Sequence, residues 1–223
     1  MRSGKCFGLC LILVVGLLAT VPALADDGEI PALSYPVFTT SAGQSADIIT
    51  LNILVEEAGV GYDYCDVPDV EMLSTGVGLG GAVSGPGFHV EYMTDTEAYP
   101  VGTPFGTLIV VIGASLKGMG ASGLTVEDEV ARVESILAYC QENDVTVVAV
   151  HVAGYTGRGA PGSDNERMID CVVPYADCLI VAAEGNEDDR FTVLAEEQGI
   201  TLVEVEYALG LVDVLKTAFS VEE

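Results

Sequence analysis

The chain has 223 residues, of which 34 are acidic, eight are lysine or arginine and half are hydrophobic, and its formal net charge at pH 7 is −26. Nucleic acids and anionic membrane surfaces need basic patches, so this acidic composition excludes both as partners. The length and the hydrophobic content suit one domain with a full core.

The first 25 residues have the features of a secretory signal peptide. Arg2 and Lys5 precede an apolar run that ends at Ala19, and an Ala-x-Ala cleavage signal follows at 23–25. The run is too short for a membrane anchor, and no later segment reaches about 18 continuous apolar residues, so no stable membrane insertion is expected. We therefore expect an exported protein, periplasmic or extracellular, that has lost residues 1–25.

The remaining chain alternates between strand and helix patterns. Residues 26–36 are expected to be a linker, and residues 37–220 a single α/β domain. Val37–Thr39 and the less apolar segment Gly61–Asp66 are expected to be strands. Four β-branched runs are typical of strands buried on both faces: Thr107–Gly113, Val145–His151, Cys178–Ala182 and Thr201–Val205. Amphipathic patterns predict helices at Ala46–Ala58, Val126–Asn143 and Leu209–Phe219, and after Ser163 and Asn186. This alternation predicts a three-layer α/β sandwich with a mainly parallel sheet of about six strands, Rossmann- or flavodoxin-like.

Three of these helices are preceded by capping motifs, in which a Ser, Thr or Asn is followed three residues later by an acid. The pairs are Thr125 with Asp128, Ser163 with Glu166, and Asn186 with Asp189. Each would satisfy the free N–H groups at the start of a helix.

One segment, residues 76–106, interrupts the alternation. It holds six glycines between Gly76 and Gly87, and then the sequence FHVEYM, which suits an edge strand or a hairpin arm. So long a loop is uncommon without a purpose. Two interpretations remain open: a lid or binding flap, and an insertion that only covers the edge of the sheet.

Four cysteines follow the signal peptide: Cys65, Cys140, Cys171 and Cys178. Export permits disulfides, and a bridge between Cys171 and Cys178 is one alternative. Cys140 and Cys178 fall at apolar positions of a helix and a strand, which favours thiols in the core. The absence of a C-x-x-C motif argues against thioredoxin-type chemistry and structural zinc.

The cations of this acidic chain fall near one edge of the predicted sheet. Ligands of open parallel sheets bind at the carboxyl ends of the strands. Lys117 and Arg158 lie in loops at that edge, and Arg167 and Arg190 follow directly after such loops. This placement predicts a site for a small anionic or polar ligand, while salt bridges to neighbouring carboxylates are the alternative. The predicted lining residues are Gln44, Ser45, Ser115, Lys117, His151, Arg158 and Asp164.

No cofactor or metal is expected. The sequence G-x-G-x-x-G at 118–123 has the letters of a dinucleotide fingerprint, but it begins five residues after its strand, and the next strand ends at His151 rather than at an acid. Lys117 precedes its glycine, so the loop is not a phosphate-binding P-loop. The two histidines, His89 and His151, are far apart, and no calcium-loop spacing occurs.

Two other functions remain open at this point. Ser115, His151 and Asp188 each follow or end a predicted strand, so they could converge as the groups of a hydrolase. A third hypothesis is an accessory protein that binds an unidentified protein partner through residues 76–106.

Four motifs together resemble a known family: TTSAGQSAD at 39–47, VIGASLKGMGASG at 111–123, HVAGYTGRGAPGSD at 151–164 and GNEDDRF at 185–191. They are similar to those of an uncharacterised family of exported bacterial proteins, the domain of unknown function 6305. The resemblance covers roughly Val37–Phe219 and implies an α/β fold and export, but no established activity. It also implies two adjacent arginines where this chain has Gly157 and Arg158.

Overall fold

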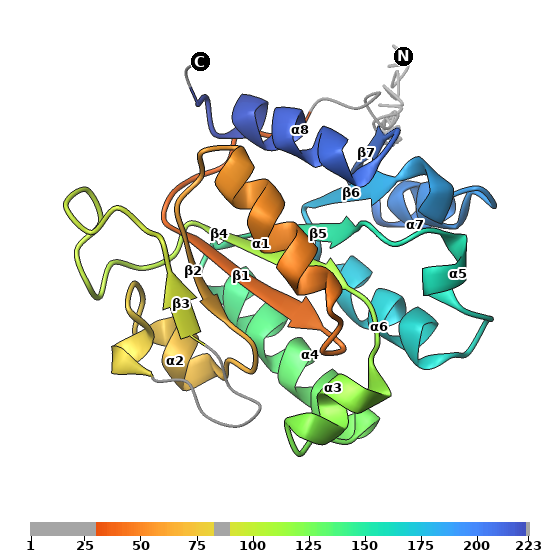
Figure 1. Cartoon of the computed structure of the whole chain (residues 1–223), viewed down its shortest axis with the longest axis horizontal. Coiled ribbons are helices and arrows are strands. Elements are labelled where there is room, and N and C mark those ends of the chain that lie inside the picture. The colour runs from red at the N-terminus through yellow and green to blue at the C-terminus, as the bar shows by residue number, and fades with distance from the viewer. Residues whose placement is uncertain (1–29, 83–89, 222–223) are drawn as a thin grey trace, which may run out of the picture.

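The computed structural model describes residues 30–82 and 90–221, so the expected signal peptide lies outside the described residues. Seven strands form one sheet (Figure 1): β1 (Val37–Ala42), β2 (Tyr62–Cys65), β3 (Val90–Tyr92), β4 (Thr107–Ile112), β5 (Thr146–His151), β6 (Cys178–Ala182) and β7 (Thr201–Val205). Their order is β3-β2-β1-β4-β5-β6-β7, and all neighbours are parallel except the edge strand β3, which is antiparallel to β2.

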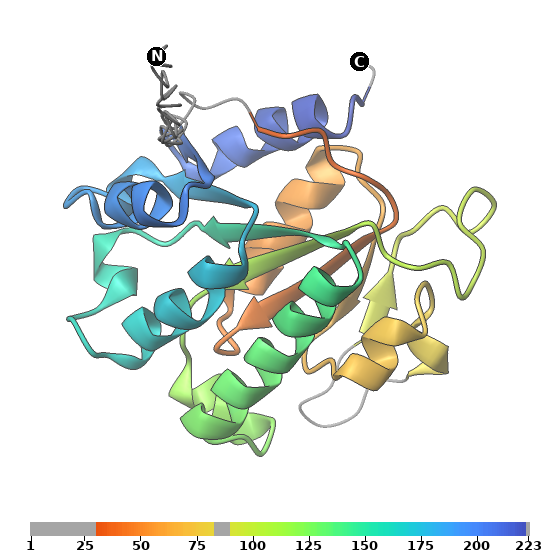
Figure 2. The same ribbon diagram turned by 180° about the vertical axis from the view of Figure 1, so that it is seen from behind.

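Helices cover both faces of this sheet. They are α1 (Asp47–Glu57), α2 (Val70–Ser74), α3 (Leu116–Ala121), α4 (Val126–Glu142), α5 (Tyr155–Arg158), α6 (Asp164–Val172), α7 (Arg190–Gln198) and α8 (Leu211–Ala218). One face carries α1 and α8 (Figure 1), and the view from behind shows α2, α4 and α6 on the other (Figure 2). The predicted three-layer α/β sandwich with a mainly parallel sheet is therefore confirmed, and the sheet has six parallel strands and one antiparallel edge strand.

The continuous apolar runs of the strands are explained by burial on both sides. In β4, Ile109 and Val111 join the core under α1 and α8, while Leu108 and Val110 join the core under α4 and α6. Successive strand residues point to opposite faces, so a strand buried on both faces needs apolar residues at every position. This is why β4 has no polar residue after Thr107.

The end of the predicted linker packs onto the sheet and α8. Leu33 is buried, and its N–H donates a 2.9 Å hydrogen bond to the carbonyl of Ala218. The hydroxyl of Thr107 donates to the carbonyl of Ser34 at 2.8 Å. Residues 33–34 are thereby attached to the start of β4 and the end of α8.

The described part of residues 76–106 lies along one edge of the sheet. Val90–Tyr92, from the sequence FHVEYM, forms β3 as an edge strand. Val77, Leu79 and Phe105 are buried in the core on the α4 side. Residues 83–89, and with them His89, lie outside the described residues.

Two of the three predicted capping motifs form helix caps, and the third does not. Thr125 and Asp128 make the full reciprocal box at the start of α4, and the Ser163 hydroxyl accepts from the N–H of Glu166. The prediction for Asn186 and Asp189 is wrong. Asp189 itself precedes α7 in a left-handed conformation without a side-chain cap. The side chain of Asn186, four residues before α7, instead caps the helix: its amide oxygen accepts the N–H of Phe191 at 2.8 Å.

All four cysteines of the described chain are free, buried thiols. The alternative of a Cys171–Cys178 bridge is therefore wrong. Cys171 lies in the core on the α4 side of the sheet, whereas Cys178 lies in the core on the α1 side. The sheet itself separates the two sulfur atoms.

Candidate functional site

The loops that follow β1 and β4 meet at the point where the sheet reverses its winding. In open α/β sheets this switch point is the usual crevice for a ligand. Here the chain closes it: Gly113 N–H donates to the Ala42 carbonyl at 3.0 Å, and Ser115 N–H donates to the Gly43 carbonyl at 2.7 Å. Gly43 has φ +96°, and a Cβ there would overlap the carbonyl oxygen of Gly113. The two loops therefore leave no open crevice between them at the switch point.

A buried ion pair holds the loop after β1 in this position. The Glu129 side chain of α4 is completely buried, and its Oε1 accepts the N–H of Gly43 at 2.8 Å. Arg132 binds the same carboxylate at 2.7 Å and donates to the carbonyl of Ser41 at 2.8 Å. The Gln44 amide donates to the carbonyl of Asp66 at 2.9 Å. The end of β1, the end of β2 and α4 are thus joined through side chains.

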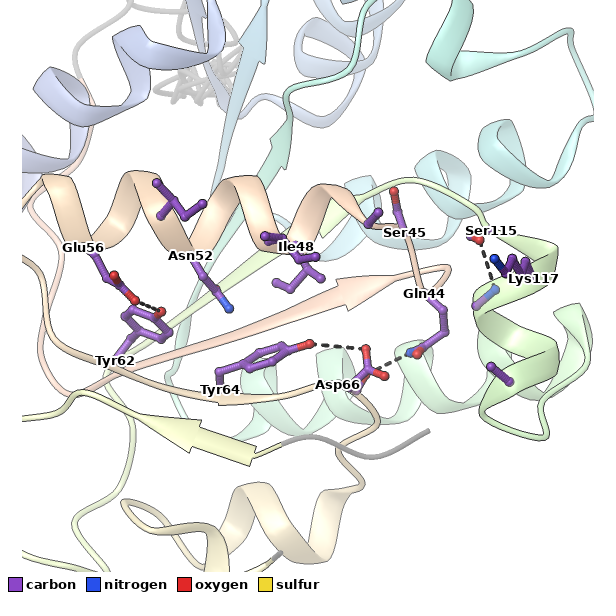
Figure 3. Close-up of a pocket in the computed structure, with 15 residues that line it drawn as sticks. Gln44, Ser45, Ile48, Asn52, Glu56, Tyr62, Tyr64, Asp66, Ser115 and Lys117 are labelled. Atoms are coloured by element: carbon purple, nitrogen blue, oxygen red, sulfur yellow. Dashed lines mark hydrogen bonds between the residues drawn. The ribbon is translucent and has the colours of Figure 1, made fainter. Parts of the chain in front are cut away.

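A cavity of about 620 Å³ lies between α1 and β2, next to the closed switch point. In Figure 3, α1 forms one wall, β2 lies opposite, and the loop and first turn of α3 close one end. The aliphatic and aromatic lining comes from Ile48, Ile49, Ile53, Tyr62 and Tyr64, and the polar lining from Gln44, Ser45, Asn52, Glu56, Asp66, Ser115 and Lys117.

The tyrosines of β2 are held by carboxylates. The hydroxyl of Tyr62 donates to Glu56 at 2.7 Å, and the hydroxyl of Tyr64 donates to Asp66 at 3.4 Å. Their rings therefore present a fixed aromatic surface to the cavity, and both carboxylates already accept a hydrogen bond from the protein.

Four of the predicted site residues line this cavity: Gln44, Ser45, Ser115 and Lys117. Three of them also have structural roles. The Gln44 side chain bonds to Asp66 and Ser122, Ser45 donates to Asp47 at 2.7 Å, and Ser115 accepts the N–H of Gly118 at the start of α3. Lys117 is exposed and holds no ion pair with a described residue.

The arginines differ from Lys117 in this respect. Arg132 pairs with Glu129, Arg158 with Glu166 and Asp188, Arg167 with Glu127 and Asp164, and Arg190 with Glu166 and Asp170. The alternative of salt bridges is therefore correct for the three arginines that the sequence placed near the sheet edge. Lys117 remains as the unpaired cation at the cavity.

The other three predicted site residues do not line the cavity. Arg158 is 4% exposed and binds Glu166 at 3.1 Å, both oxygens of Asp188 and the carbonyl of Gly185. Asp164 pairs with Arg167 at the start of α6. His151, Arg158 and Asp164 therefore do not share this cavity with Lys117.

His151 is a buried group at the end of β5. It donates from Nδ1 to the carbonyl of Ile112 at 3.2 Å, and its ring lies 5.1 Å from that of Phe191. Its Nε2 is buried and has no hydrogen-bond partner among the described residues. Burial lowers the pKa of His151 below the usual 6.5, so the imidazole is neutral at neutral pH.

Ser115, His151 and Asp188 do not form the hydrogen-bonded triad of a hydrolase. Ser115 bonds to the backbone of Gly118, His151 bonds to the backbone of Ile112, and Asp188 pairs with Arg158. A serine nucleophile needs its base within hydrogen-bond reach. Within residues 30–82 and 90–221, no group of three or more His, Cys, Asp or Glu side chains is placed to hold a metal ion.

Sequence reasoning missed Asn52, Glu56, Tyr62, Tyr64 and Asp66. They lie on α1 and in or directly after β2, whereas the site predicted from the sequence consisted of loops at the strand ends. A signal for Asn52 exists in the sequence, since it interrupts the apolar run ITLNILV of α1. The β2 residues carry no comparable signal, because only the order of the strands brings them beneath α1.

Within the described residues, no helix is both long and apolar enough to cross a membrane. Neither the comparison with curated proteins nor the comparison with solved structures gave a match. Residues 34–219 match the family model described as Domain of unknown function (DUF6305). The match covers most of the chain, from the segment before β1 to the end of α8, and therefore all of the cavity and the closed switch point. The chain thus belongs to this family, a domain of unknown function.

Proposed function

We propose that the protein is an exported binding protein for a small organic anion, which occupies the cavity between α1 and β2. The observation that carries this proposal is Lys117. Among the described residues it is the one cation that lines this cavity, and no described carboxylate pairs with it. A ligand carboxylate there would form a charge-assisted hydrogen bond without displacing an existing partner.

The apolar lining of the cavity favours an organic rather than an inorganic anion as the ligand. Ile49 and Ile53 are 63% and 52% exposed beside the buried ring of Tyr62. A ligand with an apolar body would cover this surface, and burial of apolar area contributes roughly 25 cal/mol per Å². Inorganic phosphate would make the contact with Lys117 but would leave these side chains in water.

Calorimetry with omega-phenylheptanoate tests the proposal. We expect binding, and we expect Lys117→Ala to weaken it by about ten-fold, the loss of one charged hydrogen bond. Lys216→Ala is the matched control, because it removes the same charge from α8, away from the cavity. Equal binding by the Lys117 variant and the wild type, or tighter binding of omega-phenylheptylamine than of the acid, would refute an anion site.

Export is part of the same proposal. It is supported by Arg2, Lys5, the short apolar run and the Ala-x-Ala signal at 23–25. Expression of the full chain in a bacterial host, followed by cell fractionation and N-terminal sequencing, should give a secreted or periplasmic protein that begins at Asp26. An intact chain that retains Met1 in the cytoplasm would contradict export.

A further inference from the structure

Asn52 is a polar side chain in the inner wall of the cavity. It lies in the second turn of α1, one helical turn after Ile48, and is only 9% exposed. Figure 3 shows its amide directed away from α1, toward the space above Tyr64. The other α1 residues that face the sheet, such as Leu51 and Val55, are apolar. A buried amide in this position needs hydrogen-bond partners.

One half of this amide has a partner inside the protein. Thr39 of β1 is fully buried, and its hydroxyl donates to Oδ1 of Asn52 at 2.9 Å. A buried hydroxyl proton without an acceptor is unfavourable by about 1–3 kcal/mol. Thr39 therefore fixes the rotation of the amide: Oδ1 is turned to the strand and Nδ2 to the cavity.

The other half of the amide has no partner. Nδ2 carries two donors, and no described residue accepts a hydrogen bond from it. The carboxylates that share the cavity accept from other groups, Glu56 from Tyr62 and Asp66 from Tyr64, and neither is hydrogen-bonded to Nδ2. The cavity thus contains a donor that is held in place by the β-sheet and is available to a ligand.

We propose that the Asn52 amide is a specificity-determining donor that selects ligands bearing a carbonyl oxygen in the body of the molecule. This inference rests on the proposed anion site and defines its ligand class: an elongated organic acid with a ketone or amide carbonyl. The acid lies at Lys117, and the carbonyl accepts from Nδ2. At 1.5 Å per residue, Asn52 is about 7 Å along α1 from the end where Ser45, Ser115 and Lys117 gather.

The spacing matters because the two contacts are made at the same time. A carbonyl adjacent to the acid would not reach Asn52 from Lys117. The apolar stretch between them would lie along Ile48 and opposite Tyr64, which are neighbours of Asn52 in the cavity. Simple fatty acids would fill this stretch but would leave Nδ2 without an acceptor, which is unfavourable once water is excluded.

A matched pair of probes tests the inference on the wild-type protein, without any mutation. The two probes, omega-benzoylhexanoate and omega-phenylheptanoate, have the same carbon skeleton and differ only by a carbonyl in place of a methylene. Calorimetry should give about five-fold tighter binding of the benzoyl acid, the gain of one neutral hydrogen bond. Equal affinity, or tighter binding of the phenyl acid, would overturn the inference.

The variant Asn52→Asp tests whether Asn52 causes the preference for the benzoyl acid. Asn52→Asp keeps an acceptor for Thr39 but removes the donor, so we expect the ratio of the two affinities to fall to about one. The new charge also lowers the affinity for both acids, which leaves their ratio as the informative quantity. Asn143→Asp, which adds the same charge at the far end of α4, should keep the five-fold ratio. A five-fold ratio that persists in Asn52→Asp would also overturn the inference.

The two proposals fail in different ways. If Lys117→Ala binds both acids as well as the wild type does, or if neither acid binds the wild type, the proposed function is wrong and the inference falls with it. If both acids bind in a Lys117-dependent manner with equal affinity, the anion site stands, and the role of Asn52 is wrong.

Discussion

The Oε1 atom of Glu129 accepts a 2.8 Å hydrogen bond from the N–H of Gly43, which is 86 residues earlier in the chain. This contact joins the first turn of α4 to the loop after β1, at the place where the sheet reverses its winding. Arg132 completes it by pairing with the same carboxylate. The pair is almost fully excluded from water, and it holds the loop after β1 in the closed switch point.

Replacement of Glu129 by Gln should destabilise the protein strongly. The substitution leaves the Arg132 guanidinium, whose side chain is 9% exposed, without its counter-charge. Breaking such a buried pair lowers the free energy of unfolding by about 3–5 kcal/mol. Urea unfolding followed by circular dichroism measures the change. Glu134→Gln on the exposed side of the same helix should change the stability by less than about 0.5 kcal/mol, and equal effects of the two variants would contradict this role.

Arg158 is expected to act in stability rather than in ligand binding. In Arg158→Lys the fork that binds Glu166 and Asp188 is lost, so we expect the free energy of unfolding to fall by about 1–3 kcal/mol. The affinity for omega-phenylheptanoate should not change, because Arg158 does not line the cavity. Calorimetry and urea unfolding of the same variant separate the two effects. Weaker binding comparable to that of Lys117→Ala would instead place Arg158 in the ligand site.

Protonation of His151 should weaken the fold at mildly acidic pH. Burial lowers its pKa in the folded protein, whereas in the unfolded chain it stays near 6.5. The unfolded state therefore binds the proton first, and the stability contributed by the neutral ring, complete above about pH 7, is lost as the pH falls through 6.5. Asn in place of His151 keeps a donor for the Ile112 carbonyl and does not titrate. The wild type should lose more stability than His151→Asn between about pH 7.5 and pH 5.5, in parallel urea titrations.

Asp63 should make the stability of the fold depend on pH in the opposite direction. The side chain is fully buried in β2, and burial raises its pKa above 3.8, although the N–H of Gly78 bonds to it. The folded state holds the proton more strongly than the unfolded state, so stability falls as the pH rises from 3.8 through the folded-state pKa. Asp63→Asn mimics the protonated form and should be more stable than the wild type at neutral pH. A less stable variant at neutral pH would show that the carboxylate form is favoured in the fold.

The four cysteines of the described residues should be unreactive in the folded protein. Burial raises the pKa of Cys65 to about 11 and that of Cys140, Cys171 and Cys178 to about 12, so almost no thiolate exists at neutral pH. Iodoacetamide should modify none of these four thiols in the native state and all four after unfolding without a reductant. Mass spectrometry counts the modifications, and fewer than four in the unfolded chain would reveal a disulfide.

Lys117 and Arg158 illustrate how far the sequence could define the candidate site. Both are cations at the carboxyl ends of strands, and no feature of the sequence separates them. Only the fold gives Arg158 two carboxylate partners from α6 and the loop after β6, while it leaves Lys117 unpaired at a cavity. Four of the seven residues that the sequence proposed for a ligand site line the cavity, whereas His151, Arg158 and Asp164 have other partners in the fold.

By itself, the sequence determined the layers of this protein. Apolar runs such as β4 require burial on both faces, and the box of Thr125 and Asp128 defines the start of α4 from neighbouring residues alone. Contacts between distant segments were decided only by the tertiary structure. They include the Thr39–Asn52 bond, the separation of Cys171 from Cys178 and the closure of the switch point by Gly43 and Gly113. The physical reason is that periodicity and capping depend on residues a few positions apart, whereas these contacts depend on the order of strands in the sheet, which local sequence does not encode.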